Sequence, residues 1–514
     1  MKNLFFTIAF SALLASPAMA EELTVTHSTA SEFETELNAA LAEAQLTADQ
    51  VTSLKVVSAT AADTETPAEM NLTDFNALRK ALSATLQNLD LSEAALKDNG
   101  VPTGDEWGDK QGSLRDMVEL VNVTLPEGIV KIGGGAFARC KKLETVNIPE
   151  TVTQILNAAF KDCTSLKIGK LPSGLKTINK EVFSQCANVT FSELPAGLET
   201  VDDYGFRGCK AMTASVMPAT LKKIGRSGFA SSGVTFNEWP ESLESVGQDA
   251  FNGAEVTFKE WFNPEATTLP IGVFAYAYSL TDFTIPATVT DLPAQVFFVA
   301  TEYNFTEAGK NYKRTLTCRN LVPPTAVNAP EKNSQATFYQ ENWMNKEHVT
   351  FKVLKEALET YQNTLPYSSM TLEALTTQMP VAVEGGEATV STELGEAAEG
   401  ILPVYEGNTT ITITPADDMT IESVTYGETP VEAEDGVVTI DVPQTPETLT
   451  VTLKKSGEEA GVEGIASDNE IIATTYYNLQ GVEISEPAEN GLYIRKQTTA
   501  NGCTIVEKVM LKAL

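Results

Sequence analysis

Apolar and polar positions between Leu125 and Phe305 follow one pattern that is repeated eight times. Each unit contains a phenylalanine, and these phenylalanines recur every 23 residues with a single interval of 22. They are Phe137, Phe160, Phe183, Phe206, Phe229, Phe251, Phe274 and Phe297. A period of this length, kept over eight copies, indicates an internal repeat.

The other apolar positions keep a fixed spacing from the phenylalanine. A turn-forming pair such as Leu125-Pro126 opens most units, and an aliphatic pair such as Ile129 and Ile132 follows it. A small residue stands three positions after each phenylalanine: Cys140, Cys163, Cys186, Cys209, Ser232, Ala254, Ala277 and Ala300. A 23-residue unit cannot bury its own apolar face, so the units must stack and each aligned row must become one column of a shared core. The pattern predicts a solenoid.

The 23-residue period, the Ala-Phe-x-x-Cys centre and the Leu-Pro turn resemble the leucine-rich repeats of BspA-like, Treponema-type surface proteins of Bacteroidetes-type bacteria. The resemblance implies an α/β solenoid, that is, a leucine-rich repeat array with a curved parallel sheet and a cap at each end. It also implies surface display and binding to other proteins, and it implies no catalytic residues.

The segment before the repeats has a different pattern. Lys2, an apolar run to Leu14 and the sequence Ala18-Met19-Ala20 predict a cleaved secretory signal peptide. Further on, Ser31 and Glu34 have the spacing of a capping box, and Phe33, Leu37 and Leu41 fall on one helical face. A strand over 51–57, a second helix marked by Phe75, Leu78, Leu82 and Leu86, and a strand-like segment over 89–92 follow. Together they predict a cap over the first coil.

The pattern after the repeats changes to a period of two. Segments such as 411–414, 438–442 and 449–453 alternate apolar and polar residues between turn signals, which predicts a small antiparallel β-sandwich that resembles Ig-like modules of bacterial surface proteins. A last module with Tyr476-Tyr477-Asn478-Leu479-Gln480-Gly481 resembles the C-terminal sorting tails of Bacteroidetes-type secreted proteins. The predicted organisation is a signal peptide (1–20), an N-terminal capping region (21–124), the repeat solenoid with its C-terminal cap (125–365), the β-sandwich (366–456), and a linker with a short C-terminal β module (457–514).

Charge and composition limit the classes of function that are compatible with this sequence. The net charge of −33 disfavours nucleic acid and anionic lipid as partners. The chain has only two histidines, which limits the supply of general bases and metal ligands. His27 lies just past the predicted cleavage site and His348 stands in a polar stretch, so both are predicted to be solvated. No metal, cofactor or catalytic pattern is predicted: Gly133-Gly134-Gly135 lacks the spacing of a phosphate loop, and a calcium site at Asp417-Asp418 has no EF-hand spacing to support it. An enzyme is not expected.

The cysteine column leaves two interpretations. An even cysteine count in an exported chain favours disulfides, and the coil spacing would permit them. However, serine and alanine occupy the same position in later units, which favours a tight buried site for small side chains and therefore buried free thiols. A row with one ligand per coil does not form a tetrahedral metal site.

The outward positions of the strand segments form the candidate binding face. Threonine recurs in it, either as a flat ligand-binding ladder of the ice-binding kind or, as we favour, because threonine is a good strand former. Three aromatic residues share a neighbouring column, which would be a contact stripe if it faces solvent and part of the core otherwise. The candidate residues are Glu144, Lys167, Thr190, Phe191, Thr213, Thr235, Phe236, Thr257, Phe258 and Thr281.

Two functions are consistent with these patterns. The first is a secreted or surface-displayed protein that mediates protein–protein interaction or adhesion through the solenoid face, with a host matrix or bacterial surface protein as its partner. The alternative is a surface glycan-binding or nutrient-capture accessory protein. After residue 20 no segment is apolar for long enough to span a membrane. We therefore expect an exported protein at the cell surface or in the extracellular space, with the periplasm as the alternative location. We also expect it to be monomeric and to be attached to the outer membrane through its tail.

Overall fold

The structure is a computed structural model of the chain. It describes residues 21–60, 66–103, 113–298, 313–326, 337–338, 349–456, 471–477, 482–484, 491–499 and 504–511. The predicted signal peptide, His348 and Ala300 lie outside these residues. The chain divides into two compact units, Met1–Thr376 with Tyr405–Asn408, and Thr377–Val404 with Thr409–Leu514.

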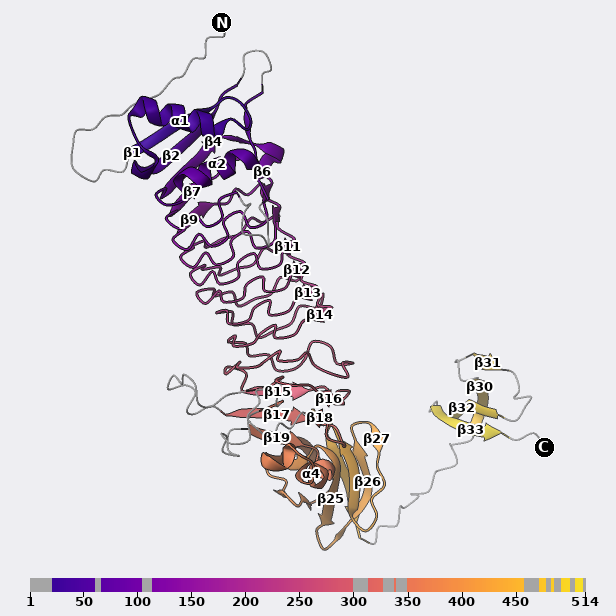
Figure 1. Cartoon of the computed structure of the whole chain (residues 1–514). Coiled ribbons are helices and arrows are strands. Elements are labelled where there is room, and N and C mark those ends of the chain that lie inside the picture. The colour runs from indigo at the N-terminus through magenta and orange to yellow at the C-terminus, as the bar shows by residue number, and fades with distance from the viewer. Residues whose placement is uncertain are drawn as a thin grey trace. The chain divides into compact units, whose positions relative to one another are not determined.

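The first unit is a stack of coils with short parallel strands along two of their sides (Figure 1). One side carries a sheet of the order β1-β2-β4-β7-β9: β1 (Glu21–His27), β2 (Val51–Ser58), β4 (Asn88–Glu93), β7 (Asn122–Thr124) and β9 (Thr145–Asn147). It resumes further along as β15 (Asp282–Ile285), β17 (Arg314–Cys318), β19 (Val349–Val353) and β20 (Thr371–Ala374). The repeats therefore form the parallel solenoid that the sequence predicts.

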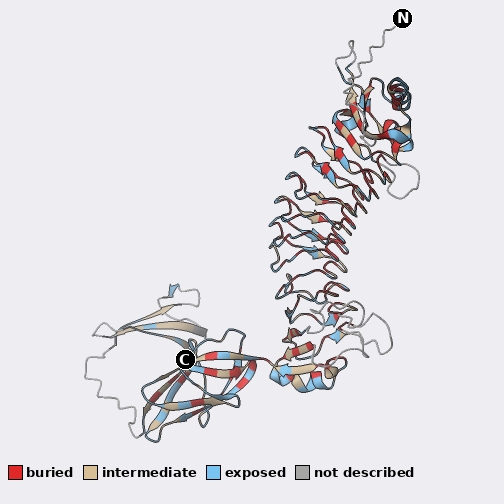
Figure 2. Ribbon diagram, turned by 90° about the vertical axis from the view of Figure 1, so that its left-hand side faces the viewer, coloured by how far each residue is buried: buried red, intermediate tan, exposed pale blue. Residues whose placement is uncertain are grey.

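The second strand side continues through the middle coils. Its strands are β6 (Gly100–Val101), β8 (Lys131–Ile132), β10 (Gln154–Ile155), β11 (Thr177–Ile178), β12 (Thr200–Val201), β13 (Lys223–Ile224), β14 (Ser245–Val246), β16 (Asp291–Leu292) and β18 (Thr325–Ala326). They pair in register between coils, with Thr177 opposite Thr200 and Thr200 opposite Lys223. Figure 2 shows buried residues recurring along the coils.

The eight repeat phenylalanines form one column through the interior. All are buried, and consecutive rings stack with centroids 5.2–6.3 Å apart and interplanar angles of 2–19°. The coil spacing of about 4.8 Å is close to the separation that offset-stacked aromatic rings prefer. The predicted phenylalanine column is confirmed.

A feature that the sequence analysis did not predict flanks this column. In the seven coils from Phe137 to Phe274, the residues two before and two after the phenylalanine have left-handed backbone, as Tyr204 (φ 60°) and Gly208 (φ 76°) do around Phe206. Most of these positions hold non-glycine residues, for which the conformation costs about 1–2 kcal/mol. The turns that result direct the phenylalanine N–H to a carbonyl of the next coil, at 2.8–3.1 Å in the eight coils. These bonds link the coils on the side without strands.

The cysteine column contains buried free thiols. Cys140, Cys163, Cys186 and Cys209 are unpaired, and each Sγ donates a hydrogen bond of 3.0–3.2 Å to the carbonyl oxygen 26 residues earlier. Burial raises the pKa of the Cys140 thiol to about 12, so it is not a reactive thiolate. The buried-thiol interpretation is confirmed for this column, and the disulfide interpretation is wrong.

The N-terminal cap contains two helices, α1 (Phe33–Ala44) and α2 (Leu72–Leu82), with a short parallel pair, β3 (Glu69–Met70) and β5 (Ala95–Leu96), and 3-10 turns η1 (Ala48–Gln50) and η2 (Lys97–Asn99). The predicted capping box at Ser31 is wrong. Glu32 is the N-cap and makes no side-chain cap, and the Ser31 N–H instead donates to Asp74 Oδ2 at 3.1 Å. The box lies on α2, where Asn71 and Asp74 cap each other's backbone.

His27 is buried, contrary to the prediction of a solvated position. Its Nδ1 lies 2.7 Å from Glu36 Oε2 on α1, and its Nε2 lies 3.8 Å from Asp74 Oδ2 on α2. Burial alone would lower the pKa of His27, but the hydrogen bond to Glu36 and the charges of both carboxylates outweigh burial and raise it. His27 therefore joins β1 to both helices of the cap.

The C-terminal end of the solenoid is closed by turns η4 (Lys355–Ala357) and η5 (Tyr367–Ser369) and by helix α4 (Leu358–Gln362). Arg314 is buried there and donates to the carbonyl oxygens of Ala277, Leu280 and Phe297 at 2.8–2.9 Å. Its guanidinium lies 5.7 Å from the Phe297 ring centroid. One buried cation thus links carbonyl groups of two successive coils at the end of the regular array.

The second unit contains two sheets around one hydrophobic cluster that includes Leu402, Ile411 and Val451. Their strands are β21 (Thr376–Glu384), β22 (Ala388–Thr392), β23 (Gly395–Glu396), β24 (Ile401–Tyr405), β25 (Gly407–Pro415), β26 (Met419–Tyr426), β27 (Thr429–Pro430), β28 (Val437–Val442) and β29 (Leu449–Lys455). The arrangement is not purely antiparallel as predicted, because β21 and β29 pair in parallel. The chain ends in an antiparallel sheet of β30 (Ile471–Tyr477), β31 (Glu483–Ile484), β32 (Gly491–Thr499) and β33 (Thr504–Leu511).

Candidate functional site

The predicted outward row forms a continuous strip on the first strand side of the solenoid. Lys167 and the threonines of the row are exposed, and Glu144 is partly exposed. Neighbouring members lie on successive coils, joined by backbone bonds such as Lys167 N–H to the Glu144 carbonyl at 2.8 Å. The exposed threonines are Thr190, Thr213, Thr235, Thr257 and Thr281.

The aromatic residues of the candidate face are not on the surface. Phe191, Phe236 and Phe258 are fully buried. Each packs edge-on against the central phenylalanine column, as Phe236 does against Phe229 with centroids 5.2 Å apart at 81°. The contact-stripe interpretation is therefore wrong for these three residues, and the core interpretation is confirmed.

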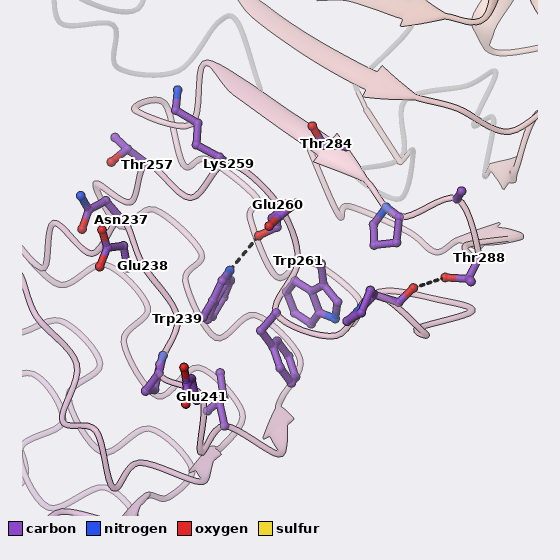
Figure 3. A pocket seen from close by; sticks show the side chains of 16 residues that line it. Asn237, Glu238, Trp239, Glu241, Thr257, Lys259, Glu260, Trp261, Thr284 and Thr288 are labelled. Atoms are coloured by element: carbon purple, nitrogen blue, oxygen red, sulfur yellow. Dashed lines mark hydrogen bonds between the residues drawn. The ribbon is translucent and has the colours of Figure 1, made fainter. Parts of the chain in front are cut away.

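A groove of about 1020 Å³ opens beside this strip, at the turns of three successive coils (Figure 3). We call it the tryptophan groove. Trp239 is half-buried in it, with one face stacked on Phe258 at 3.7 Å and its Nε1 donating to the Glu260 carbonyl at 2.7 Å. Its lining residues are Asn237, Glu238, Trp239, Pro240, Glu241, Leu243, Thr257, Lys259, Glu260, Trp261, Phe262, Pro264, Thr284, Pro286, Ala287 and Thr288.

The groove lies where the repeat is irregular. The turn prolines Pro218, Pro240, Pro264 and Pro286 are 22, 24 and 22 residues apart instead of 23, and Trp-Pro and Trp-Phe-Asn-Pro replace the usual Leu-Pro. The phenylalanine rings are most widely separated at this level, 6.3 Å between Phe251 and Phe274. Large aromatic side chains fill the wider spacing and leave the groove at the surface.

The walls of the groove carry carboxylates without cation partners. Glu238, Glu241 and Glu260 line it, and no lysine or arginine of the described residues makes an ion pair with them. Lys259 is the one cation of the lining, and its Nζ lies 3.7 Å from Asp282. Coils nearer the N-terminus differ, since Lys167 pairs there with Glu144 one coil away at 2.8 Å.

The groove was not predicted from the sequence. The available signal was the coincidence of two tryptophans at the turn position with the 22- and 24-residue intervals. Among the residues described, no group of three or more His, Cys, Asp or Glu side chains is placed to hold a metal ion. The aromatic and carboxylate lining is suited to binding a ligand by packing and charge.

Comparison with known proteins agrees with the geometry. The family described as the BspA type leucine rich repeat region matches in six copies, over residues 110–213 and 176–304. The repeat region belongs to the BspA type. These BspA-type repeats contain both the exposed strip and the tryptophan groove. No curated protein matches the chain significantly.

Several solved structures are similar to the chain. A leucine-rich repeat protein from T. pallidum is 23% identical over 36% of this chain and 79% of its own, with a TM-score of 0.25. One from Bacteroides ovatus is 17% identical over 54% and 91%, with a TM-score of 0.29. A leucine-rich cell surface protein from Faecalibacterium prausnitzii is 16% identical over 54% and 86%, with a TM-score of 0.23. At these TM-scores the similarities add no argument to the family assignment.

Proposed function

We propose that the protein is a secreted or surface-displayed binding protein that engages other proteins, or mediates adhesion, through the first strand side of its solenoid. Leucine-rich repeat proteins generally take part in protein–protein interaction, which supports this proposal. The observation that carries it is the exposed strip from Glu144 to Thr281, which a rigid scaffold presents over successive coils. Short threonine side chains lose little conformational entropy when a partner covers them.

Export and attachment are part of the same proposal. The predicted signal peptide over residues 1–20 and the tail-like sequence after residue 457 support them. No helix within the described ranges is long and apolar enough to cross a membrane. We propose the five-part organisation with boundaries at 20, 124, 365 and 456, in which an Ig-like β-sandwich follows the solenoid. Protease treatment of intact cells tests surface display, and an array that stays protected contradicts it.

Binding by the strip can be tested with a pair of matched variants. The purified full chain is used to capture partners from matrix proteins and from surface proteins of neighbouring bacteria. T213R/T235R places two bulky cations on the strip and should abolish capture. T177R/T200R makes the same change on the second strand side and should leave capture intact. Absence of any partner for the wild type, or equal loss in both variants, contradicts the proposal.

Glycan binding remains the second candidate, with narrower support than the sequence suggested. The buried Phe191, Phe236 and Phe258 cannot stack on a sugar. The half-buried Trp239 and Phe262 of the groove are the aromatic residues that favour this alternative. Silence of the full chain on a glycan array would remove it.

A further inference from the structure

We propose that the tryptophan groove binds a basic segment of a protein partner, with an arginine or lysine side chain held between its carboxylates and its aromatic walls. This inference rests on the proposed protein-binding function and assigns the partner chemistry of one site within it. Three properties of the groove favour a cationic occupant: its charge, its aromatic lining and its size.

The glutamates of the groove favour a cationic ligand. Glu238 and Glu260 occupy the same row position one coil apart, and both line the groove, so their negative charges act on the same surface region. Like charges that share a concave surface repel each other, and a bound cation reduces that repulsion. Elsewhere the solenoid supplies that cation itself, as Lys222 does for Glu199 at 2.9 Å. In the groove the lining cation Lys259 pairs with Asp282, and no lysine or arginine of the described residues pairs with Glu238 or Glu260, so a ligand can supply the cation.

The aromatic lining favours the same kind of ligand. Trp239 and Phe262 are only partly buried, and Trp261 lies at 5.3 Å from Trp239, tilted by 69°. A guanidinium or ammonium group is attracted to the face of such rings, most strongly to tryptophan. The solenoid already uses this contact with its own side chains, for example Arg207 at 5.6 Å from the Tyr204 centroid and Arg314 at 5.7 Å from that of Phe297.

The dimensions suit a segment of chain. A volume of about 1020 Å³ is at the upper end of the range found for small-ligand pockets, so it accommodates several residues of an extended peptide. Figure 3 shows Glu238 and Lys259 at the rim, with Trp239 and Trp261 between them and Thr288. Asn237, Thr257 and Thr284 add uncharged hydrogen-bonding groups that suit a peptide backbone.

A binding experiment with the full chain tests the inference. The probes are a labelled hexa-arginine peptide and the neutral hexasaccharide maltohexaose, and the readouts are fluorescence anisotropy and intrinsic tryptophan emission. E238Q/E260Q removes two groove charges without removing a packed side chain. E432Q/E434Q removes two exposed charges from the second unit and controls for the non-specific attraction of a chain with a net charge of −33. Unchanged thermal unfolding of both variants shows that each is folded.

We expect the peptide to bind the wild type and to change its tryptophan emission. E238Q/E260Q should weaken peptide binding by about tenfold or more, because charge-assisted contacts are lost, while E432Q/E434Q should change it by less than about twofold. Equal weakening in both variants would refute the inference, and so would binding of maltohexaose in place of the peptide. The partner-capture assay separates the two proposals. If E238Q/E260Q captures partners as the wild type does, the groove inference is wrong and the proposed function stands. If the wild type captures no partner, the proposed function is wrong.

Discussion

Two parts of the same solenoid share one type of core but differ in the sign of their surface charge. The phenylalanine column runs through both, yet residues 131–226 contain 14 Lys and Arg and 8 Asp and Glu, whereas residues 230–290 contain 8 Asp and Glu and a single lysine. In the first part, lysines pair with carboxylates across neighbouring coils, at 2.6 Å for Lys161 and Glu181. In the second part the groove carboxylates have no such partner among the described residues. The repeat constrains the buried positions, and the exposed positions are free to acquire a binding site.

The largest expected effect tests whether the two parts really share one core. Phe160→Ala and Phe251→Ala each remove a buried ring from the stacked column, and each should destabilise the first unit by about 3–5 kcal/mol. Urea unfolding followed by circular dichroism measures the loss. Phe251 lies beside the wider coil spacing, where neighbouring aromatics can relax into the space, so its value should be the smaller of the two. A loss below about 1 kcal/mol at Phe251 would show that the column is not continuous through the groove.

The next prediction compares a buried cation with an exposed one. Arg314→Met removes the three hydrogen bonds that a buried guanidinium donates to carbonyl oxygens at the end of the column, and it should cost about 3 kcal/mol. Arg139→Met removes a half-exposed guanidinium that pairs with Asp116 and should cost about 1 kcal/mol or less. The same unfolding measurement distinguishes them. Equal losses would mean that the cap at Arg314 does not close the array.

A pH dependence should arise in the N-terminal cap. The raised pKa of His27 means that its contacts stabilise the fold fully below pH 6.5, the ordinary pKa, and that this stability is lost as the pH rises through the folded-state value. The pKa of Glu36 is lowered: burial alone would raise it, but the hydrogen bonds from His27 and Ser28 outweigh burial. Its contribution is therefore lost in acid. Urea midpoints measured from pH 6 to pH 9 should fall for the wild type.

Two variants test whether His27 is the group responsible for that pH dependence. His27→Gln should unfold at a lower urea concentration at pH 6 and should lose most of the decline towards pH 9. His348→Gln removes the other histidine of the chain and should keep the decline. A wild-type slope that persists in His27→Gln would place the titrating group elsewhere.

Sequence alone predicts the periodic part of this molecule because stacking turns each repeated apolar residue into a column. The phenylalanines and cysteines are therefore visible from spacing alone. The left-handed pair around each phenylalanine is not, since residues as different as Arg139 and Gln185 occupy it and the preference comes from the coil as a whole. His27 was predicted on the surface because nothing in its local sequence shows that Glu36 and Asp74 surround it.

The candidate site was predicted only in its regular part. The exposed strip follows from strand alternation, but Phe191 and its equivalents were ambiguous because an aromatic column can line either side of a coil. Their burial depends on edge-on packing against column rings of their own coil and of the next, as Phe191 packs against Phe183 and Phe206. The groove lies where the repeat interval departs from 23 residues, so the periodic pattern gives no information about its shape.

The smallest expected effect on stability comes from a substitution that gives the second part of the solenoid a cation like those of the first part. Glu260→Lys places a lysine one coil after Glu238, as Lys167 follows Glu144 in the first part. Replacing a like-charge neighbour by an exposed ion pair should stabilise the first unit by about 0.2–1 kcal/mol, measured as an increased urea midpoint. The same change should abolish hexa-arginine binding, because the groove then supplies its own cation. Glu193→Lys, at the same row position outside the groove, should leave peptide binding unchanged, and a loss of binding there would mean that total charge, not the groove, attracts the peptide.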